Sequence, residues 1–182
     1  EQASWESVGD LFARRERVTQ ISYLADRGYH HVLALLPPSL GVDSRIERRS
    51  LSAMRRAARS GGIELQVERM PLEPGRPQLT VREWLRRDAL PDAIAAYNDE
   101  FAIAVISALK AEGIDVPKDV AVMGLDDLSL GRVFTPALTT ITVDFTAFAA
   151  AVAQAVKARA DGSGETQPLP LPTHSVVIRE SA

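Results

Sequence analysis

The sequence contains no cysteine among its 182 residues. Disulfide bonds, thiolate nucleophiles and cysteine-ligated zinc are therefore excluded. No apolar run approaches the roughly 20 residues that a membrane helix needs, and no signal peptide opens the chain. From these absences we expect a cytoplasmic protein with no membrane partner.

The usual signatures of nucleotide-dependent and hydrolytic enzymes are also missing. The chain has neither a GxxxxGK[ST] nor a GxGxxG loop, so nucleotide hydrolysis and dinucleotide binding have no motif support. It has no GxSxG, the usual signal of an α/β-hydrolase nucleophile. Of its histidines, His30 and His31 form a pair at the mouth of a strand, which is more simply a surface feature than a metal site. We expect no catalytic residue, metal or cofactor.

Neither sign of charge dominates the sequence. Its formal net charge of −3 argues against broad contact of this segment with nucleic acid, because such contact needs a basic surface. Apolar residues make up 46% and charged residues 25% of the chain, as in an ordinary soluble globular protein. A chain of this length can bury roughly 70% of its unfolded surface, enough for a sizeable core.

Short apolar runs alternate with helical patterns along the chain. We expect strands at residues 32–36, 63–67, 93–97, 120–123, 139–143 and 174–179. We expect helices at residues 14–27, 46–60, 78–88 and 145–160, with one more between Asn98-Asp99 and Gly113. A short extended segment that closes at Leu11-Phe12 precedes them. Strands that alternate with helices predict a mostly parallel sheet in a Rossmann-like, three-layer α/β fold.

The most informative stretch runs from residue 91 to residue 128. Its first apolar run ends on Asn98-Asp99, and its second is followed by Gly124-Leu125-Asp126-Asp127. A third run ends in the loop of residues 37–44. Because open parallel sheets bind ligands at the carboxyl ends of their strands, we expect these three exits to lie on one edge and to form a binding crevice.

Each polar residue at these exits also has a purely structural interpretation. Asn98 is a good helix N-cap, Asp99 would favour the helix dipole, and Asp126 suits a turn. A buried Asp126 carboxylate would also suit paired hydroxyls such as those of a sugar, since each of its oxygens accepts hydrogen bonds. The pair Asp126-Asp127 leaves magnesium as a weaker alternative.

The expected helix at 46–60 and its entry loop carry a run of arginines: Arg45, Arg48, Arg49, Arg55, Arg56 and Arg59. Most of these side chains are expected to be solvated. Arg45 or Arg49, near the helix start, is the one expected to turn toward the crevice, and phosphate binding is the alternative use of the run.

The stretch 91–141 resembles the C-terminal half of a bacterial regulator of the LacI/GalR family. The matching residues are Asn98-Asp99, Val116-Pro117, Asp119-Val120-Ala121-Val122, Gly124, Asp126-Asp127, Pro136 and Leu138-Thr139-Thr140. A looser likeness extends back to about residue 8 through Gly28-Tyr29 and forward to Arg179-Glu180-Ser181.

This resemblance implies a periplasmic binding protein-like fold reduced to essentially its C-terminal lobe. Residues 1–143 would form that lobe, residues 144–170 would belong to the N-terminal lobe, and residues 171–182 would return as a strand. The DNA-reading helix-turn-helix would be missing. The helix at 145–160, expected to be strongly amphipathic, would then pack its apolar stripe on the lobe or against a second copy.

The resemblance also implies an effector site between the lobes. Asn98 and Asp126 match residues that bind effector hydroxyls, and Phe145 matches an aromatic residue that packs on the ligand. The family's arginine position falls on Ser50, which leaves Arg49 or Arg45 as substitutes. Phe12 stands where an acidic ligand contact is usual.

The implied function is that of a non-enzymatic, homodimeric transcriptional regulator. A small effector, expected to be a carbohydrate, would shift the population between inter-lobe angles and so control operator binding through the missing head. Two alternatives remain: a solute-binding protein for sugar uptake, which shares the fold, and a small α/β enzyme that uses Asp126 as acid or base.

Overall fold

The computed structural model describes residues 5–38, 45–161 and 171–182, and side chains for residues 14–38, 47–161 and 171–182. In chain order the elements are α1 (Trp5–Asp26), β1 (His31–Leu36), α2 (Arg45–Ser60), β2 (Glu64–Arg69), α3 (Arg76–Arg86), β3 (Ala93–Ala96), α4 (Asp99–Ala111), β4 (Ala121–Met123), α5 (Ser129–Val133), β5 (Thr140–Asp144), α6 (Thr146–Ala160) and β6 (Thr173–Val177).

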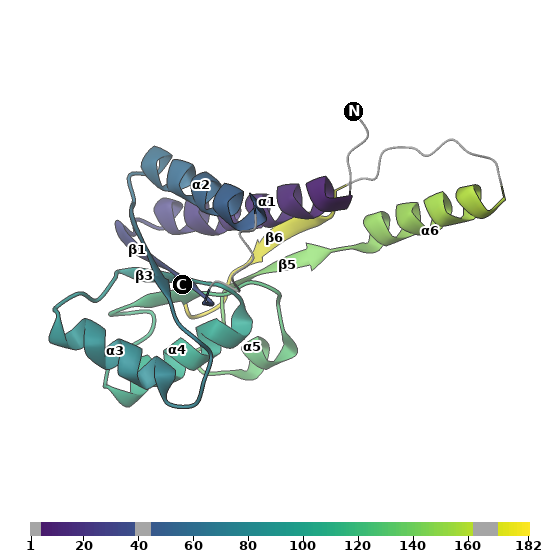
Figure 1. The fold of residues 1–182 in the computed structure, drawn as a ribbon. Helices are drawn as coiled ribbons and strands as arrows, with labels where there is room; N and C mark the ends of the chain where they lie inside the picture. The colour runs from purple at the N-terminus through teal and green to yellow at the C-terminus, as the bar shows by residue number, and fades with distance from the viewer. Residues whose placement is uncertain (1–4, 39–44, 162–170) are drawn as a thin grey trace.

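Four strands form the central sheet in the order β2-β1-β3-β4, and every neighbouring pair is parallel. Helices α1 and α2 cover one face, and α3, α4 and α5 lie on the other (Figure 1). The expected three-layer α/β fold with a mostly parallel sheet is therefore confirmed. The strand at 63–67 is expected at an edge, and β2 is one of the two outermost strands of this sheet.

The alternation of side chains along β1 explains how one apolar run supplies two cores. Val32 and Ala34 pack into the core beneath α1 and α2, whereas Leu33 and Leu35 pack into the core beneath α3 and α4. Successive residues of a strand point to opposite faces, so a strand covered on both faces is apolar throughout.

A two-stranded antiparallel sheet, β5 with β6, leads out of the central body toward α6 (Figure 1). A bridge between Met123 and Thr139 joins the end of β4 to the segment that enters β5. The polypeptide returns along β6, and Ser181 then accepts at its backbone oxygen from the amide of Val122 at 2.7 Å. This returning segment matches the terminal strand expected near residues 174–179.

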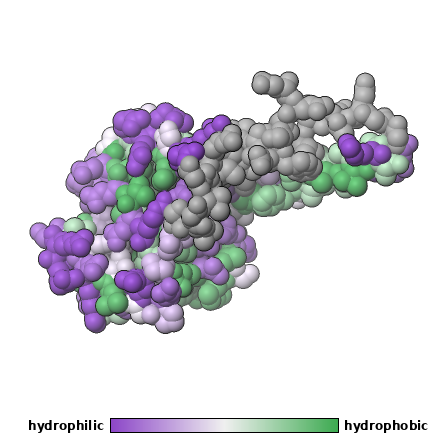
Figure 2. Space-filling model, viewed as in Figure 1, coloured by the Kyte–Doolittle hydropathy of each residue, from purple (hydrophilic) through white to green (hydrophobic). Residues whose placement is uncertain are grey.

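Helix α6 extends away from the lobe and buries none of its residues. Figure 2 shows hydrophobic residues along it, and Val156 is 63% exposed. The expectation that this helix packs on the lobe is therefore wrong, and burial against a second copy stays a prediction. The expected strong amphipathicity is also wrong, because alanines such as Ala147, Ala150 and Ala153 stand outside the predicted stripe.

Two further differences concern helices. The extended segment expected to close at Leu11-Phe12 is helical, because α1 begins at Trp5 and continues through this segment to Asp26. Helix α5 has five residues, which is too short to show a helical period in the sequence.

Most of the predicted linker, residues 162–170, lies outside the described residues. No helix in the described ranges combines the length and the apolar character that crossing a membrane requires.

Candidate functional site

The exits of β3 and β4 meet at the carboxyl edge of the central sheet. The amide of Asp99 donates to the backbone oxygen of Leu125 at 2.9 Å, and the amide of Leu128 donates to Asp99 Oδ2 at 2.7 Å. The predicted convergence of these two exits is therefore confirmed. The loop after β1 lies mostly outside the described residues, so its part in the crevice stays a prediction.

Asn98 caps α4, as its structural interpretation predicted. Its Oδ1 accepts from the amide of Phe101 at 3.0 Å, and its extended backbone is typical of an N-cap. Within the described residues its Nδ2 donates no hydrogen bond. Because Asn98 is half-buried at the carboxyl edge, this nitrogen remains available to a ligand.

Asp126 lies on the second exit with its side chain exposed. Its amide donates to the backbone oxygen of Ile141 at 2.9 Å, and its φ of 120° is one that residues other than glycine rarely adopt. Partial burial raises the pKa of its carboxyl group, nearby Asp99 and Glu100 raise it further, and Arg17 opposes them. The carboxylate is presented to solvent, and no hydrogen bond or ion pair to it is found among the described residues.

Asp99 serves the architecture of the site. Its carboxyl group is fully buried and accepts from Thr140 Oγ1 at 2.6 Å and from the amide of Leu128. Burial raises its pKa, and these hydrogen bonds oppose the rise. A Cβ on Gly124 would lie 2.1 Å from Asp99 Oδ1, so only glycine fits where the end of β4 passes this carboxyl group.

Asp127 is held by two arginines. Arg179 Nη2 donates to its Oδ1 at 2.5 Å, and Arg132 Nη2 donates to its Oδ2 at 2.8 Å. Burial alone would raise the pKa of Asp127, but the bonds and charges of the two guanidinium groups outweigh it and lower the pKa. With both oxygens engaged by cations, the magnesium alternative for Asp126-Asp127 loses its second ligand.

Three buried polar residues of α1 lie near the same edge, two of them bound to it by hydrogen bonds, and the sequence analysis did not single them out. Arg17 donates to the backbone oxygens of Ala96 at 3.0 Å and Tyr97 at 2.5 Å. Gln20 Nε2 donates to the backbone oxygens of Ala96 and Met123, each at 3.0 Å. The sequence could have indicated their burial, because Arg17 and Gln20 lie four residues before the predicted core residues Ile21 and Leu24, on the same helix face.

Glu16 is the third of these residues, and only 6% of its surface is exposed. Burial raises the pKa of its carboxyl group to about 7; the charge of Arg17 opposes this rise and that of Asp126 adds to it. Arg17 also lies 5.0 Å from the ring centroid of Tyr97. We call Glu16, Arg17, Tyr97, Asn98 and Asp126 the edge cluster.

The remaining predicted contacts lie outside the edge cluster. Phe145 precedes α6 and is 51% exposed, while Arg49 has an exposed side chain on α2. Arg45 is the first residue of α2, and Phe12 lies within α1. The side chains of both lie outside the described residues. Their roles as ligand contacts stay predictions.

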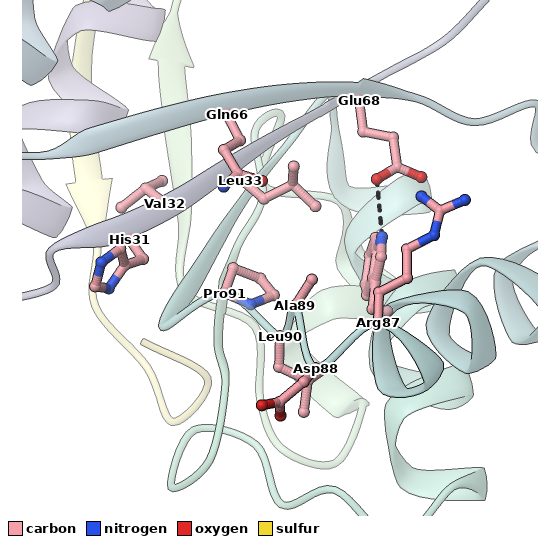
Figure 3. Close-up of a pocket in the computed structure, with 11 residues that line it drawn as sticks. His31, Val32, Leu33, Gln66, Glu68, Arg87, Asp88, Ala89, Leu90 and Pro91 are labelled. Atoms are coloured by element: carbon pink, nitrogen blue, oxygen red, sulfur yellow. Dashed lines mark hydrogen bonds between the residues drawn. The ribbon is translucent and has the colours of Figure 1, made fainter.

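A cavity of about 410 Å³ lies away from this edge, against edge strand β2 and the end of α3 (Figure 3). Trp84 Nε1 donates to Glu68 Oε2 at 2.8 Å in its wall. His31, at the start of β1, and Pro91, before β3, line its other side, so it opens near the amino ends of the strands. The side chain of His31 is 60% exposed and lies 3.3 Å from Asp92 Oδ2, in keeping with a surface role for this histidine.

Comparison with known proteins assigns the chain to a family. Residues 21–182 match the family described as the periplasmic binding protein-like domain. The HTH-type transcriptional repressor PurR of Vibrio atlanticus is 30% identical over 122 residues, which are 65% of this chain and 36% of that protein. The ribose operon repressor of Escherichia coli is 29% identical over 130 residues, again covering 65% of this chain and 36% of the repressor.

Solved structures agree on the fold. The Escherichia coli transcriptional repressor ascG superimposes with a TM-score of 0.78 at 23% identity, over 94% of this chain and 62% of that one. The complex of the transcriptional regulator CelR with cellobiose gives a TM-score of 0.76 at 22% identity, over 94% and 52% of the two chains. The matched region is thus about a third of the curated relatives' length. The chain belongs to the periplasmic binding protein-like domain family.

Proposed function

We propose that this chain is the effector-binding portion of a LacI-type transcriptional regulator and that its effector is a carbohydrate. The observation that carries the proposal is the meeting of the two strand exits that hold Asn98 and Asp126, at the carboxyl edge where open parallel sheets bind ligands. An exposed carboxylate and an available amide nitrogen together offer acceptors and a donor to vicinal hydroxyls.

The relatives support a sugar as the effector class. One is named a ribose operon repressor, a LacI family transcriptional regulator was solved in complex with lactose, and the transcriptional regulator CelR was solved in complex with cellobiose. Phe145 would offer its ring to a sugar face, Arg49 or Arg45 would add a donor, and Phe12 would give the pocket an apolar wall in place of an acid. The named curated relatives are repressors, which favours a regulator over a solute-binding protein or an enzyme.

The proposed mechanism is a population shift without covalent chemistry. An effector that binds one inter-lobe angle better than another biases the protein toward that angle by its differential affinity. In a cytoplasmic homodimer that bias would set whether DNA-binding segments outside this chain can engage an operator. The lobe alone supplies one wall of the cleft, so we expect it to bind sugars weakly.

The test is an NMR titration of the ¹⁵N-labelled 182-residue chain with D-ribose, lactose and cellobiose at millimolar concentration. At least one sugar should shift the amides of Asn98 and Asp126, and both Asn98→Ala and Asp126→Asn should weaken its binding about tenfold. Asp88→Asn is the matched control, because Asp88 is also exposed with a positive φ of 51° but lies by the other cavity. Equal affinity in all three variants would remove the site assignment.

A further inference from the structure

Glu16 is an acidic residue of α1 whose side chain is mostly buried. Only 6% of its surface is exposed, and within the described part of the chain its carboxyl group makes no hydrogen bond, although the charge of Arg17 acts on it. Its oxygens are not among the fully buried polar atoms that lack a partner, so the carboxyl group still reaches solvent. A hydrogen-bond donor from outside the described residues can therefore approach it.

The contacts of the neighbouring residue place Glu16 at the carboxyl edge. Arg17 is bound to the backbone oxygens of Ala96 and Tyr97, the last two residues before Asn98. Glu16 precedes Arg17 on the same helix, so its main chain lies near the exit of β3. It also lies close enough to Asp126 for that carboxylate to act on it across the edge.

We propose that Glu16 is a third polar contact to the effector, supplied by α1 beside Asn98 and Asp126. This inference rests on the proposed function. Two carboxylates at one edge suit a neutral molecule that donates several hydroxyl hydrogens, and they repel an anion. The effector class therefore narrows to neutral polyols, with phosphorylated sugars disfavoured.

The charged groups around Glu16 define how its contact depends on pH. Arg17 is the cation beside it on α1, Asp126 faces it from the β4 exit, and Glu100 acts on Asp126 from α4. On β6, His174 lies 2.8 Å from Thr19 of α1, and burial together with the charge of Arg15 lowers its pKa.

The experiment measures the affinity for D-ribose and for cellobiose by NMR titration at pH 6, 7 and 8. A hydroxyl donates better to an ionised carboxylate than to a protonated one, so wild-type affinity should rise up to about tenfold from pH 6 to pH 8. Glu16→Gln should bind with the pH 6 affinity of the wild type at every pH. Ribose 5-phosphate should bind at least tenfold more weakly than ribose.

Glu100→Gln is the matched control, because it removes one carboxylate near Asp126 from an exposed position. It should follow the wild-type pH profile. If a sugar binds and Asn98→Ala weakens it, while Glu16→Gln keeps the wild-type profile, the Glu16 contact is wrong and the proposed function stands. If neither sugar shifts any edge amide at any pH, the proposed function fails and the Glu16 contact fails with it.

Discussion

The guanidinium group of Arg17 donates to the backbone oxygen of Tyr97 at 2.5 Å and lies 5.0 Å from the centroid of the same residue's ring. One buried cation thus binds both the main chain and the aromatic face of the residue that precedes Asn98. Burial lowers the pKa of Arg17, and Glu16, Tyr97 and Asp126 oppose this effect. The position of the candidate effector residues depends on this contact.

Replacing Arg17 by methionine should destabilise the lobe. The substitution keeps much of the side-chain volume but leaves the oxygens of Ala96 and Tyr97 with fewer donors, at a cost of about 2–4 kcal/mol. Urea unfolding followed by circular dichroism measures this free energy. The control is Arg82→Met, which removes an ion pair with Glu112 from a side chain that is 61% exposed and should cost below about 1 kcal/mol. Equal losses in both variants would contradict the role given to Arg17.

Glu16 should make the stability of the lobe depend on pH between about 4.5 and 7. Its folded pKa of about 7 lies above the ordinary 4.5, so within this window the unfolded chain releases a proton that the folded chain keeps. Unfolding therefore becomes easier as pH rises, and the loss is complete above pH 7. Glu16→Gln removes this titration. Its free energy of unfolding, relative to that of the wild type, should therefore rise by about 3 kcal/mol between pH 4 and pH 8.

The measurement is a series of urea unfolding curves for wild type and Glu16→Gln at pH 4, 5, 6, 7 and 8. Subtracting the two cancels groups with the opposite sign, such as Asp127, whose lowered pKa makes it lose stability as pH falls. If the difference in unfolding free energy between the two proteins does not change with pH, Glu16 has the same pKa in the folded and unfolded chain, and this prediction is wrong.

Helix α6 should bring two copies of the chain together. It buries none of its residues, and Phe145, just before the helix, and Val156, within it, are 51% and 63% exposed. Exposed apolar surface of this kind is typical of a protein–protein contact, because burying it away from water is favourable. Sedimentation velocity should show a dimer that dissociates on dilution, and Val156→Asp should shift it toward monomer. Arg159→Asp, on the same helix, is the control for added charge. A monomer at every concentration would overturn this prediction.

The parts of the fold that the sequence predicted are those set by local pattern. The apolar runs that became β1, β3 and β4 end where the structure ends them, within one or two residues. The convergence of Asn98 and Asp126 followed from the parallel arrangement, because that arrangement sends all strand exits to one edge. The N-cap role of Asn98 followed from its place before a helix.

The parts that escaped prediction are set by distant partners. Arg17 is buried because carbonyl oxygens some 80 positions further along the chain accept its hydrogen atoms, and no local pattern records them. Asp127 is neutralised by Arg179, which is brought to it by the returning strand β6. The position of α6 also depends on surfaces that its own sequence does not contain.

Gly124 gives the site a constraint of a different kind. Its missing Cβ leaves room for Asp99 Oδ1, whose carboxyl group in turn binds Thr140 and the amide of Leu128. Residues 99, 124 and 140 therefore form an epistatic set, in which the tolerated side chain at one position depends on the other two. Substitutions at the proposed effector contacts Glu16, Asn98 and Asp126 should therefore be made while that set is held constant.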